Sequence, residues 1–341
     1  MFSNGKAHEN CVDENGHYIL VNSKFVSTDG SVFKKVTAQL SPLFKSQFVM
    51  VMSDLPNGKA LAKCYYIEED NIYTLNQRIC SFSAINGNIS RFLMYQICRN
   101  KYYLRFDDGI NQTNLKKREV LACPVFIPSK EEQTKIAVFL HLLDKRISIQ
   151  NKIIEKLQSL IKGIRNNMMI QNQGDYIALQ DIADIYQPKT ILSTDLTEDG
   201  YLVYGANGII GKYHLYNHEK EQICITCRGN TCGTVNYTEP KSWITGNAMV
   251  INTDNFAENV NKRYLFHYLS SINFNSIISG SGQPQIVRQP LAKLKIILPE
   301  LTIQEHIAKC LDTILAKIKN EQTSLQAIQI QKSYLLSQMF I

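Results

Sequence analysis

The chain contains one stretch of sequence twice. Residues 133–147 read QTKIAVFLHLLDKRI and residues 304–318 read QEHIAKCLDTILAKI, so the copies lie 171 positions apart in a chain of 341 residues. In both copies apolar residues recur at steps of four and three, the heptad pattern of a helix that packs along another helix. Each copy therefore predicts one long helix, and a helix with a single apolar stripe needs a partner to cover it.

The apolar stripe of each predicted helix, here called its seam, is the surface expected to meet the other helix. The register holds without insertion over about 40 residues, which corresponds to a length of about 60 Å at 1.5 Å per residue. The seam residues of the first copy are Ile136, Leu140, Leu143, Ile147, Ile154, Leu157 and Ile161. Those of the second copy are Ile307, Leu311, Ile314, Ile318, Leu325, Ile328 and Leu335.

Two polar residues predict the direction in which the helices pair. Gln150 and Glu321 interrupt the two seams near their middles. Antiparallel packing brings these residues together as one polar layer that fixes the register. We therefore predict an antiparallel coiled-coil pair. The alternative is two amphipathic helices buried in separate cores, and their length and unbroken register argue against it.

A strand-rich domain precedes each predicted helix. Short apolar strands are predicted at 121–128 (LACPVFIP) and 292–299 (AKLKIILP), again 171 positions apart. Further strands with glycine-bearing turns between them are predicted at 47–53, 62–70, 221–229 and 248–254. The sequence thus predicts an α+β fold with a pseudo-two-fold internal repeat: a first domain at 1–128, a helix at 129–173, a second domain at 174–299 and a helix at 300–341.

Composition narrows the classes of function. No apolar run approaches the roughly 20 residues that span a bilayer, and the opening residues lack the features of a secretory signal, so we expect a cytoplasmic protein without membrane contact. Nine cysteines without a regular spacing fit reduced thiols better than disulfides. The net charge of +7, with its basic excess in residues 1–172, permits an acidic partner such as nucleic acid.

The pattern P-x4-Q-x2-I-A occurs at Pro128–Ala137 and at Pro299–Ala308, each time before a long heptad helix that ends in Met-Met or Met-Phe. With these motifs the chain resembles the specificity subunit of Type I restriction-modification enzymes. The second domain, in the stretches 194–216 and 225–250, looks like one class of that family's target recognition domains. The first domain, in the stretches 16–30 and 48–79, looks like another class.

This resemblance implies a non-catalytic subunit. Each domain would read one half of a split site in double-stranded DNA, while the helices hold the two domains at a fixed separation and bind methyltransferase subunits. The resemblance also allows for restriction or translocase subunits as partners. It places S-adenosylmethionine on the methyltransferase and implies no cofactor for this chain.

One segment departs from the family pattern. Family members begin with an opening segment comparable to YIALQDIADIYQPK at 176–189, yet 171 positions earlier this chain reads GKAHENCVDENGHY. We expect the first domain to start late, either because it is completed differently or because it is a shortened form.

Candidate DNA-reading residues are polar side chains on turns beside predicted strands. Arginine and lysine suit guanine, and asparagine and glutamine suit adenine. The alternative for any single residue is a solvated turn or a cap. In the first domain the candidates are Lys59, Asn76, Gln77, Gln112, Asn114, Lys116, Lys117 and Arg118. In the second domain they are Tyr204, Asn207, Lys212, Arg228, Asn230, Thr245, Asn247, Gln283, Gln285 and Arg288.

The sequence also contains residue types that could bind a metal ion. His214, His218, Cys224, Cys227 and Cys232 offer zinc-ligand chemistry. However, Cys224 and Cys227 lie three positions apart in a predicted strand and would point to opposite faces of it. We therefore expect buried free cysteines and no metal site. The chain has no GxxxxGK[ST] motif, no Asn-Pro-Pro-aromatic motif and no clear paired-carboxylate motif, so it is not expected to be an enzyme. Two rival functions stay open: a stand-alone DNA-binding regulator and a protein-binding coiled-coil adaptor.

Overall fold

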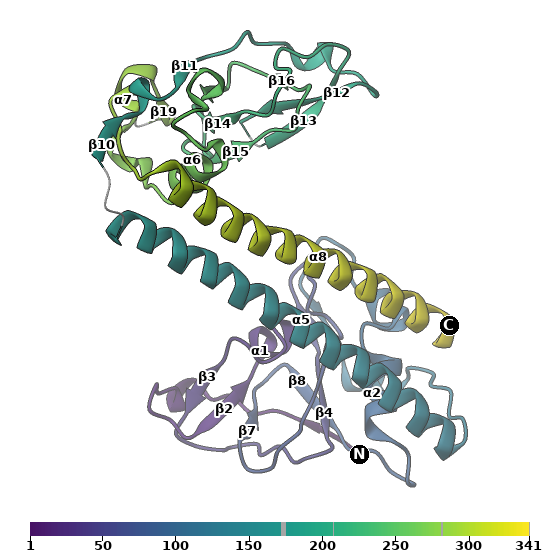
Figure 1. Ribbon diagram of the computed structural model, residues 1–341. Coiled ribbons are helices and arrows are strands. Elements are labelled where there is room, and N and C mark those ends of the chain that lie inside the picture. Colours follow the sequence, from purple (N-terminus) through teal and green to yellow (C-terminus); the bar gives the residue numbers. More distant parts are fainter. Residues whose placement is uncertain (172–174, 207, 281, 341) are drawn as a thin grey trace. The chain divides into compact units, whose positions relative to one another are not determined.

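The computed structural model describes residues 1–171, 175–206, 208–280 and 282–340 (Figure 1). The chain forms two compact units. The first unit is Met1–Ile149 with Leu325–Ile341, and the second unit is Gln150–Ser324. Each unit thus combines one globular domain with part of each long helix. Within the described residues, no helix combines the length and apolar character needed to cross a membrane.

The two long helices are α5, Lys130–Gln171, and α8, Leu301–Met339. A capping box starts α5, because the carboxylate of Glu132 accepts hydrogen bonds from the hydroxyl (2.6 Å) and the backbone N–H (3.0 Å) of Ser129. None of the fourteen predicted seam residues is exposed. Those that are almost fully buried are Leu140, Ile154, Ile161, Leu311, Ile318 and Ile328.

The pairing of α5 and α8 is antiparallel, as contacts within the second unit show. In the second unit, the Gln150 amide donates to the carboxylate and backbone oxygens of Glu321. Further along α5 in the same unit, Arg165 bonds the His267 ring (3.1 Å), which also bonds Asp312 of α8 (2.8 Å). From Gln150 to Arg165 on α5, the facing residue on α8 therefore goes from Glu321 back to Asp312. In the first unit, Lys332 of α8 pairs with Asp144 of α5. The predicted polar layer of Gln150 and Glu321 is confirmed.

The globular part of the first unit consists of short strands and helices. Its strands are β1 (Phe2–Asn4), β2 (Tyr18–Val21), β3 (Lys34–Val36), β4 (Phe48–Val51), β5 (Ser53–Asp54), β6 (Cys64–Tyr66), β7 (Tyr73–Leu75), β8 (Ile79–Phe82) and β9 (Thr113–Asn114). Its helices are η1 (Glu9–Cys11), α1 (Ser23–Ser27), α2 (Ser90–Ile97), α3 (Lys101–Leu104) and α4 (Lys117–Leu121). The sheet orders are β1-β8-β4-β6, β3-β2-β7 and β5-β9.

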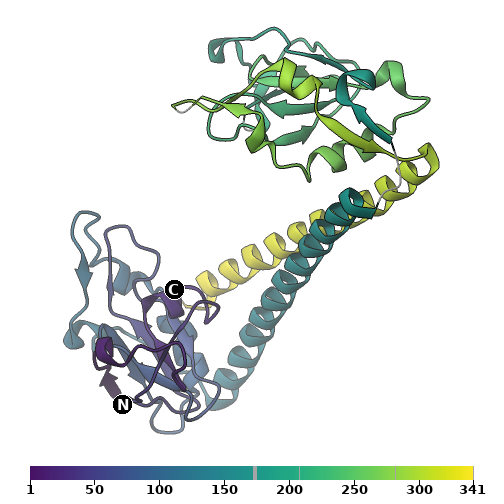
Figure 2. The same cartoon turned by 90° about the vertical axis from the view of Figure 1, so that its left-hand side faces the viewer.

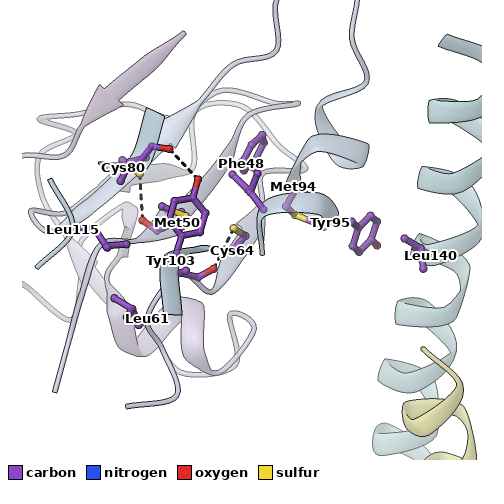
Figure 3. Packing of buried hydrophobic residues seen from close by; sticks show 13 residues of the cluster. Phe48, Met50, Leu61, Cys64, Cys80, Met94, Tyr95, Tyr103, Leu115 and Leu140 are labelled. Atoms are coloured by element: carbon purple, nitrogen blue, oxygen red, sulfur yellow. Dashed lines mark hydrogen bonds between the residues drawn. The ribbon is translucent and has the colours of Figure 1, made fainter. Parts of the chain in front are cut away.

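The core of the first unit joins its sheet to α5. Phe48, Met50 and Cys80 from β4 and β8 pack with residues of α2 in one buried cluster, which extends to Leu140 of α5 (Figure 3). Tyr95 of α2 lies between the sheet and Leu140 in this view and donates a 2.5 Å hydrogen bond to Asp144 of the same helix. The domain is therefore attached to its helix by apolar packing and a polar contact together.

The globular part of the second unit has a longer series of strands. They are β10 (Asp175–Ala178), β11 (Asp184–Tyr186), β12 (Tyr201–Gly205), β13 (Gly208–Tyr213), β14 (Ile223–Thr226), β15 (Val235–Tyr237), β16 (Trp243–Ile244), β17 (Ala248–Asn252), β18 (Ile278–Ser279), β19 (Gln285–Ile286) and β20 (Lys295–Leu298). The helices are η2 (Leu179–Asp181), η3 (Ser193–Asp195), η4 (Asp254–Phe256), α6 (Lys262–Leu269), η5 (Phe274–Ser276) and α7 (Arg288–Ala292). The sheet orders are β11-β17-β14-β15, β13-β12-β16, β10-β20 and β18-β19.

The two globular domains share one topology although their sequences show little likeness outside the matched segments. The order β1-β8-β4-β6 corresponds to β11-β17-β14-β15, and β3-β2-β7 corresponds to β13-β12-β16. In both three-stranded sheets the first strand along the chain pairs in parallel with the last one, β2 with β7 and β12 with β16. Both views show these strands confined to the globular part of each unit (Figure 2).

One expectation about the first domain needs correction. The strand predicted at 121–128 is absent from the described structure, where 123–129 have no regular secondary structure, whereas β20 forms at the matching place in the second domain. Phe2–Asn4 pairs with β8 as Asp184–Tyr186 pairs with β17, so β1 takes the place of β11. The late start of the first domain stays a prediction.

Candidate nucleic-acid interface

Three segments of the second domain meet at one edge, here called the second polar edge. The backbone N–H of Cys227, just after β14, donates to the carbonyl of Asn247, just before β17 (3.0 Å). The carbonyl of Cys227 accepts the N–H of Ile286 in β19 (3.0 Å). These bonds hold residues distant in sequence side by side on a rigid backbone.

The side chains at the second polar edge are those of predicted base-reading residues. The structure brings together Arg228, Asn230, Asn247, Gln283 and Gln285, and all five are exposed. Their amide and guanidinium groups supply the donors and acceptors that base edges need. The second polar edge therefore presents these donors and acceptors together on one side of the domain.

The hairpin of β12 and β13 is fastened to the same edge. The hydroxyls of Thr226 and Thr231 both donate to the carbonyl of Ala206, at 2.7 and 2.8 Å. The neighbouring candidate Asn207 lies outside the described residues. These two hydrogen bonds to a backbone carbonyl therefore hold the β12–β13 hairpin at the second polar edge.

Sequence reasoning missed the segment 187–190 beside this edge. The amide of Gln187 donates to the carbonyl of Gly246. A Cβ on Gly246 would lie 2.4 Å from the hydroxyl of Thr190, so the two segments pack closely and a larger residue would not fit. Lys189 is exposed between them. The segment 187–190 follows β11 directly, but the sequence predicts no strand at 184–186 that would point to it.

Two residues of the second domain that were predicted to read bases are buried, so the prediction does not hold for them. Tyr204 is 5% exposed and packs in the core with Cys224 and Val250, and its hydroxyl accepts the backbone N–H of Glu239 (3.1 Å). Thr245 is 1% exposed. Both side chains are inside the domain and cannot reach a base.

Two further candidates have partners within the protein. Lys212 on β13 lies 3.6 Å from Asp199. The guanidinium of Arg288 at the start of α7 donates to the carbonyl of Ile185 in β11 (2.7 Å), so this arginine helps to hold the sheet.

The first domain has an edge built in the same way, here called the first polar edge. The N–H of Met52 donates to the carbonyl of Arg78 (3.0 Å), and the carbonyl of Met52 accepts the N–H of Leu115 (2.8 Å). These two bonds match those of Cys227 in the second domain. Met52, Arg78 and Leu115 therefore take the places of Cys227, Asn247 and Ile286.

Gln112 and Asn114 lie together on the first polar edge. The amide of Gln112 donates to the hydroxyl of Ser53 (2.8 Å), and that hydroxyl donates to the amide oxygen of Asn114 (2.6 Å). Arg78 was missed, although it follows two candidates directly. It is exposed and adopts a φ of 68°, which marks the tight turn before β8.

The other candidates of the first domain lie elsewhere on it. Gln77 donates to Glu9 (3.0 Å), so it is engaged with the opening segment of the chain. The backbone N–H of Asn76 donates to the carbonyl of Val21 (3.0 Å). Lys59 is exposed on the loop between β5 and β6.

A basic stretch follows the first polar edge. It consists of Lys116, Lys117 and Arg118 at the start of α4, and all three are exposed. The ammonium of Lys117 lies 5.4 Å from the centre of the Phe2 ring, a cation–π distance. These groups are suited to phosphate contacts.

Negative charge also borders the first polar edge. A hollow of about 170 Å³ is lined by Asp108, Asn111, Gln112, Asn114 and Glu119, among others. Hydrogen bonds from the backbone and side chain of Asn111 and from the Ile110 N–H lower the pKa of Asp108 to about 2. This carboxylate is ionised at neutral pH and disfavours a phosphate there, while carboxylates can accept from a cytosine amino group.

The described residues contain no cluster of three or more His, Cys, Asp or Glu side chains that could hold a metal ion. All nine cysteines are free, and burial raises the pKa of Cys224 to about 12. His218 instead bonds the Tyr186 hydroxyl (2.9 Å) and the Asn217 side chain (2.6 Å).

Two domains of one topology, each with an exposed polar edge and each anchored on an antiparallel helix pair, define a recognition protein with an internal repeat. Residues 2–159 and 175–329 match the family described as Type I restriction modification DNA specificity domain. The chain belongs to this family.

Known proteins similar to this chain carry related descriptions. The putative type I restriction enzyme specificity subunit S.HindORF215P of Haemophilus influenzae is 29% identical over 165 residues, which cover 47% of this chain and 40% of that protein. The type I restriction enzyme EcoprrI specificity subunit of Escherichia coli is 31% identical over 112 residues, or 33% and 27% of the two chains. The match therefore spans less than half the length of these relatives.

Solved structures share the fold. The S subunit of a Type-I restriction-modification system from M. genitalium superposes with a TM-score of 0.73 at 16% identity, covering 100% of this chain and 93% of that chain. A chain from a study of complex assembly and conformational transition of the type I R-M system has a TM-score of 0.53 at 13% identity, covering 100% and 97%.

Proposed function

We propose that this chain is the DNA sequence-recognition subunit of a Type I restriction-modification complex. Each globular domain would read one half of a bipartite site in double-stranded DNA. One observation carries the proposal: the two polar edges have the same backbone frame, and their side chains differ at two of three matched places. Arg78, Gln112 and Asn114 occupy the places of Asn247, Gln283 and Gln285. Arginine suits guanine and the carboxamides suit adenine, so equivalent places would read different bases.

The helix pair would set the spacer between the two half-sites and would bind methyltransferase subunits. An exposed apolar stripe on α5 supports the second role. Val138, Leu142 and Ile149 are 52%, 57% and 57% exposed and follow each other at steps of four and seven. Such a stripe on a helix is typical of a surface that a partner covers.

In this proposal the chain has no catalytic role and no cofactor of its own. The methyltransferase subunits would bind S-adenosylmethionine, and restriction or translocase subunits would join where the system contains them. DNA modification by such a complex takes place in the cytoplasm.

A domain exchange tests the proposal. Residues 174–299 are replaced by the second domain of another family member, and the chain is co-expressed with its methyltransferase. Methylation-aware sequencing of the host genome then reports the modified site. We expect one half-site to change and the other to persist. A change in both halves, or in neither, would contradict the assignment of one domain to one half-site.

Two further measurements, co-purification with a methyltransferase and selection from a random duplex library, separate the rival functions. A stand-alone regulator would select a split DNA sequence without co-purifying with a methyltransferase. A protein-binding adaptor would select no split sequence from a random duplex library.

A further inference from the structure

A hollow of about 470 Å³ lies against the two long helices within the second unit. Its walls come from the C-terminal part of α5, from α8 and from the residues directly after α6. Lys162 and Arg165 of α5 line it, and none of the described residues around it is acidic. The hollow therefore holds two positive charges without a negative one.

No ion pair joins Arg165 to a carboxylate among the described residues. Its guanidinium donates to Nδ1 of the His267 ring (3.1 Å), and the Nε2 of that ring bonds the carboxylate of Asp312 (2.8 Å). Asp312 pairs in turn with Arg263, whose Nε donates to both carboxylate oxygens (3.0 and 2.9 Å). The carboxylate that Arg165 reaches through the histidine is thus taken by another arginine.

Part of the Arg165 head group is also buried. Its Nε has no hydrogen-bond partner in the described part of the chain. Burial, together with the positive charge of Arg263, lowers the pKa of Arg165 below its ordinary value. A positive charge that is taken out of water without a counter-ion costs stability, so its presence at this place indicates an anion that comes from outside the described chain.

The matching place in the first unit carries other residues. At the offset of 171, Arg165 corresponds to Leu336, which packs on the core of the first domain. Lys162 corresponds to Ser333. The two positive charges therefore belong to the second unit alone at this pair of positions, and the repeat forms without them.

The rest of the lining indicates the kind of anion. Ile161, Leu315 and Ile318 from the two seams form an apolar part of the wall. A free, strongly hydrated anion gains little beside such a wall. An acidic side chain on a protein surface instead brings a carboxylate together with apolar neighbours, and a carboxylate matches the N–H groups that Arg165 still has available.

We propose that this hollow receives an acidic side chain of the methyltransferase subunit that binds the second unit. The carboxylate pairs with Arg165 and Lys162, and an apolar side chain beside it covers the wall formed by the seam residues. This inference rests on the proposed function, which has such subunits bind the helix pair, and it adds the contact by which the second unit holds its subunit.

Carbodiimide cross-linking of the complex with the co-expressed methyltransferase tests the contact directly. The reagent joins a lysine amine to a carboxylate that lies against it, and mass spectrometry identifies the joined peptides. We expect Lys162 to be joined to an aspartate or glutamate of the methyltransferase subunit, and Lys162→Ser to lose that product. Absence of any product from Lys162, or products only with acidic residues of this chain in the same or a second copy, would overturn the proposal.

Two variants test the same contact by affinity. Lys162→Ser and Arg165→Gln each remove one positive charge, and the glutamine keeps an amide donor. Each should weaken binding of the methyltransferase subunit by about tenfold or more at low salt. Each should also reduce the salt dependence of the dissociation constant, because salt screens charge pairs. Neither should lower the melting temperature of the free chain, since the removed charges have no carboxylate partner among its described residues.

Lys152→Ser is the matched control, because it removes the same charge from an exposed position of α5 outside the hollow. Equal weakening by this control, or unchanged binding in both hollow variants, would overturn the inference and leave the proposed function standing. Weaker binding that comes with a lower melting temperature of both free variants would overturn it as well. A chain that binds no methyltransferase would overturn this inference and the proposed function together.

Discussion

Gln133 and Gln304 lie 171 residues apart and share two hydrogen bonds, one from the N–H of a helix cap and one to the carbonyl of the preceding proline. The amide oxygen of Gln133 accepts the N–H of Ile89 (2.9 Å), and its nitrogen donates to Asn88 and to the carbonyl of Pro128 (both 3.0 Å). Gln304 accepts the N–H of Asn261 (2.8 Å) and donates to the carbonyls of Asn259 (2.9 Å) and Pro299 (2.7 Å). Ile89 and Asn261 are the N-terminal caps of α2 and α6.

This relationship explains the P-x4-Q motif physically. A glutamine five residues after the proline reaches back to its carbonyl and also caps the helix that packs on the long helix. One buried side chain thereby ties the entry of the long helix to its domain.

The first prediction concerns these two glutamines. Gln133→Ala or Gln304→Ala should lower the free energy of unfolding of its own unit by about 1–3 kcal/mol, because each leaves buried backbone groups without partners. Urea denaturation, with hydrogen exchange at α2 or α6 to identify the unit, measures the effect. Gln331→Ala on the exposed face of α8 is the matched control and should stay within about 0.5 kcal/mol. Equal losses in control and test variants would contradict the anchoring role.

The repeat made the helices and their direction predictable, because heptad spacing is a local signal and Gln150 with Glu321 fixed the register. The common topology of the domains was not predictable in this way. Strand pairing joins residues far apart in sequence, and at the polar edges the sequence shows only short matches, such as Gln112 with Gln283 and Leu115 with Ile286.

The errors at particular residues have physical causes. Tyr204 and Thr245 follow the turn pattern of base-reading residues, yet the sequence does not say which face of a strand end points inward. The strand predicted at 121–128 has the right composition, but a strand forms only beside a partner, and none of the described residues supplies one. Arg78 was missed because its position beside Met52 arises from backbone contacts between β4 and β8.

The second prediction concerns acid stability of the second unit. His267 is buried between the guanidinium of Arg165 (3.1 Å) and the carboxylate of Asp312 (2.8 Å). Burial, with help from the neighbouring arginines, lowers the pKa of His267 to about 4. The folded unit therefore holds this histidine neutral, whereas the unfolded chain protonates it below about pH 6.5.

Proton linkage predicts that acid lowers the free energy of unfolding of the second unit. Below about pH 6.5 the unfolded state binds one more proton, so the free energy of unfolding should fall by about 1.4 kcal/mol per pH unit until about pH 4. His267→Gln should remove most of this slope. Part of the slope should remain because burial also lowers the pKa of His218. Urea midpoints between pH 7 and 4 report the slope, and the exposed His214→Gln is the control. An unchanged slope in His267→Gln would assign the acid sensitivity elsewhere.

The third prediction concerns the polar layer between α5 and α8. Glu321→Leu alone removes the carboxylate partner of the half-buried Gln150 amide and leaves it only the backbone oxygen of residue 321, so it should destabilise the pair by about 1–3 kcal/mol. The double variant Gln150→Leu with Glu321→Leu completes an apolar seam and should be at least as stable as the parent protein, since apolar replacements of buried polar pairs are often neutral or stabilising. Thermal melting compares the three proteins. A double variant less stable than the single one would show that this layer stabilises the pair as well as fixing its register.

The fourth prediction separates the two polar edges. Arg78→Ala should relax base preference in the half-site of the first domain, and Asn247→Ala should do so in that of the second domain. Loss of one good base contact reduces discrimination by about 1–3 kcal/mol, or roughly 5- to 150-fold. Sequence selection from a random duplex library measures both half-sites in one experiment. Lys241→Ala, on a turn where Lys241 lies 3.9 Å from Glu219, serves as the control. A variant that relaxes both half-sites would mean that the edges do not read separately.

The fifth prediction tests the helix pair as a ruler. A duplicate of residues 147–153 is inserted after Ile153, and a duplicate of 318–324 after Ser324, so that each helix gains one heptad and the seams stay in register. Seven residues lengthen a helix by about 10.5 Å, and a base pair occupies about 3.4 Å of duplex. We therefore expect the methylated site to keep both half-sites while its spacer grows by about three base pairs. Insertion into α5 alone is the control, because it displaces one seam against the other and should destabilise the pair. An unchanged spacer in the doubly extended protein would show that the separation of the half-sites is set by something other than helix length.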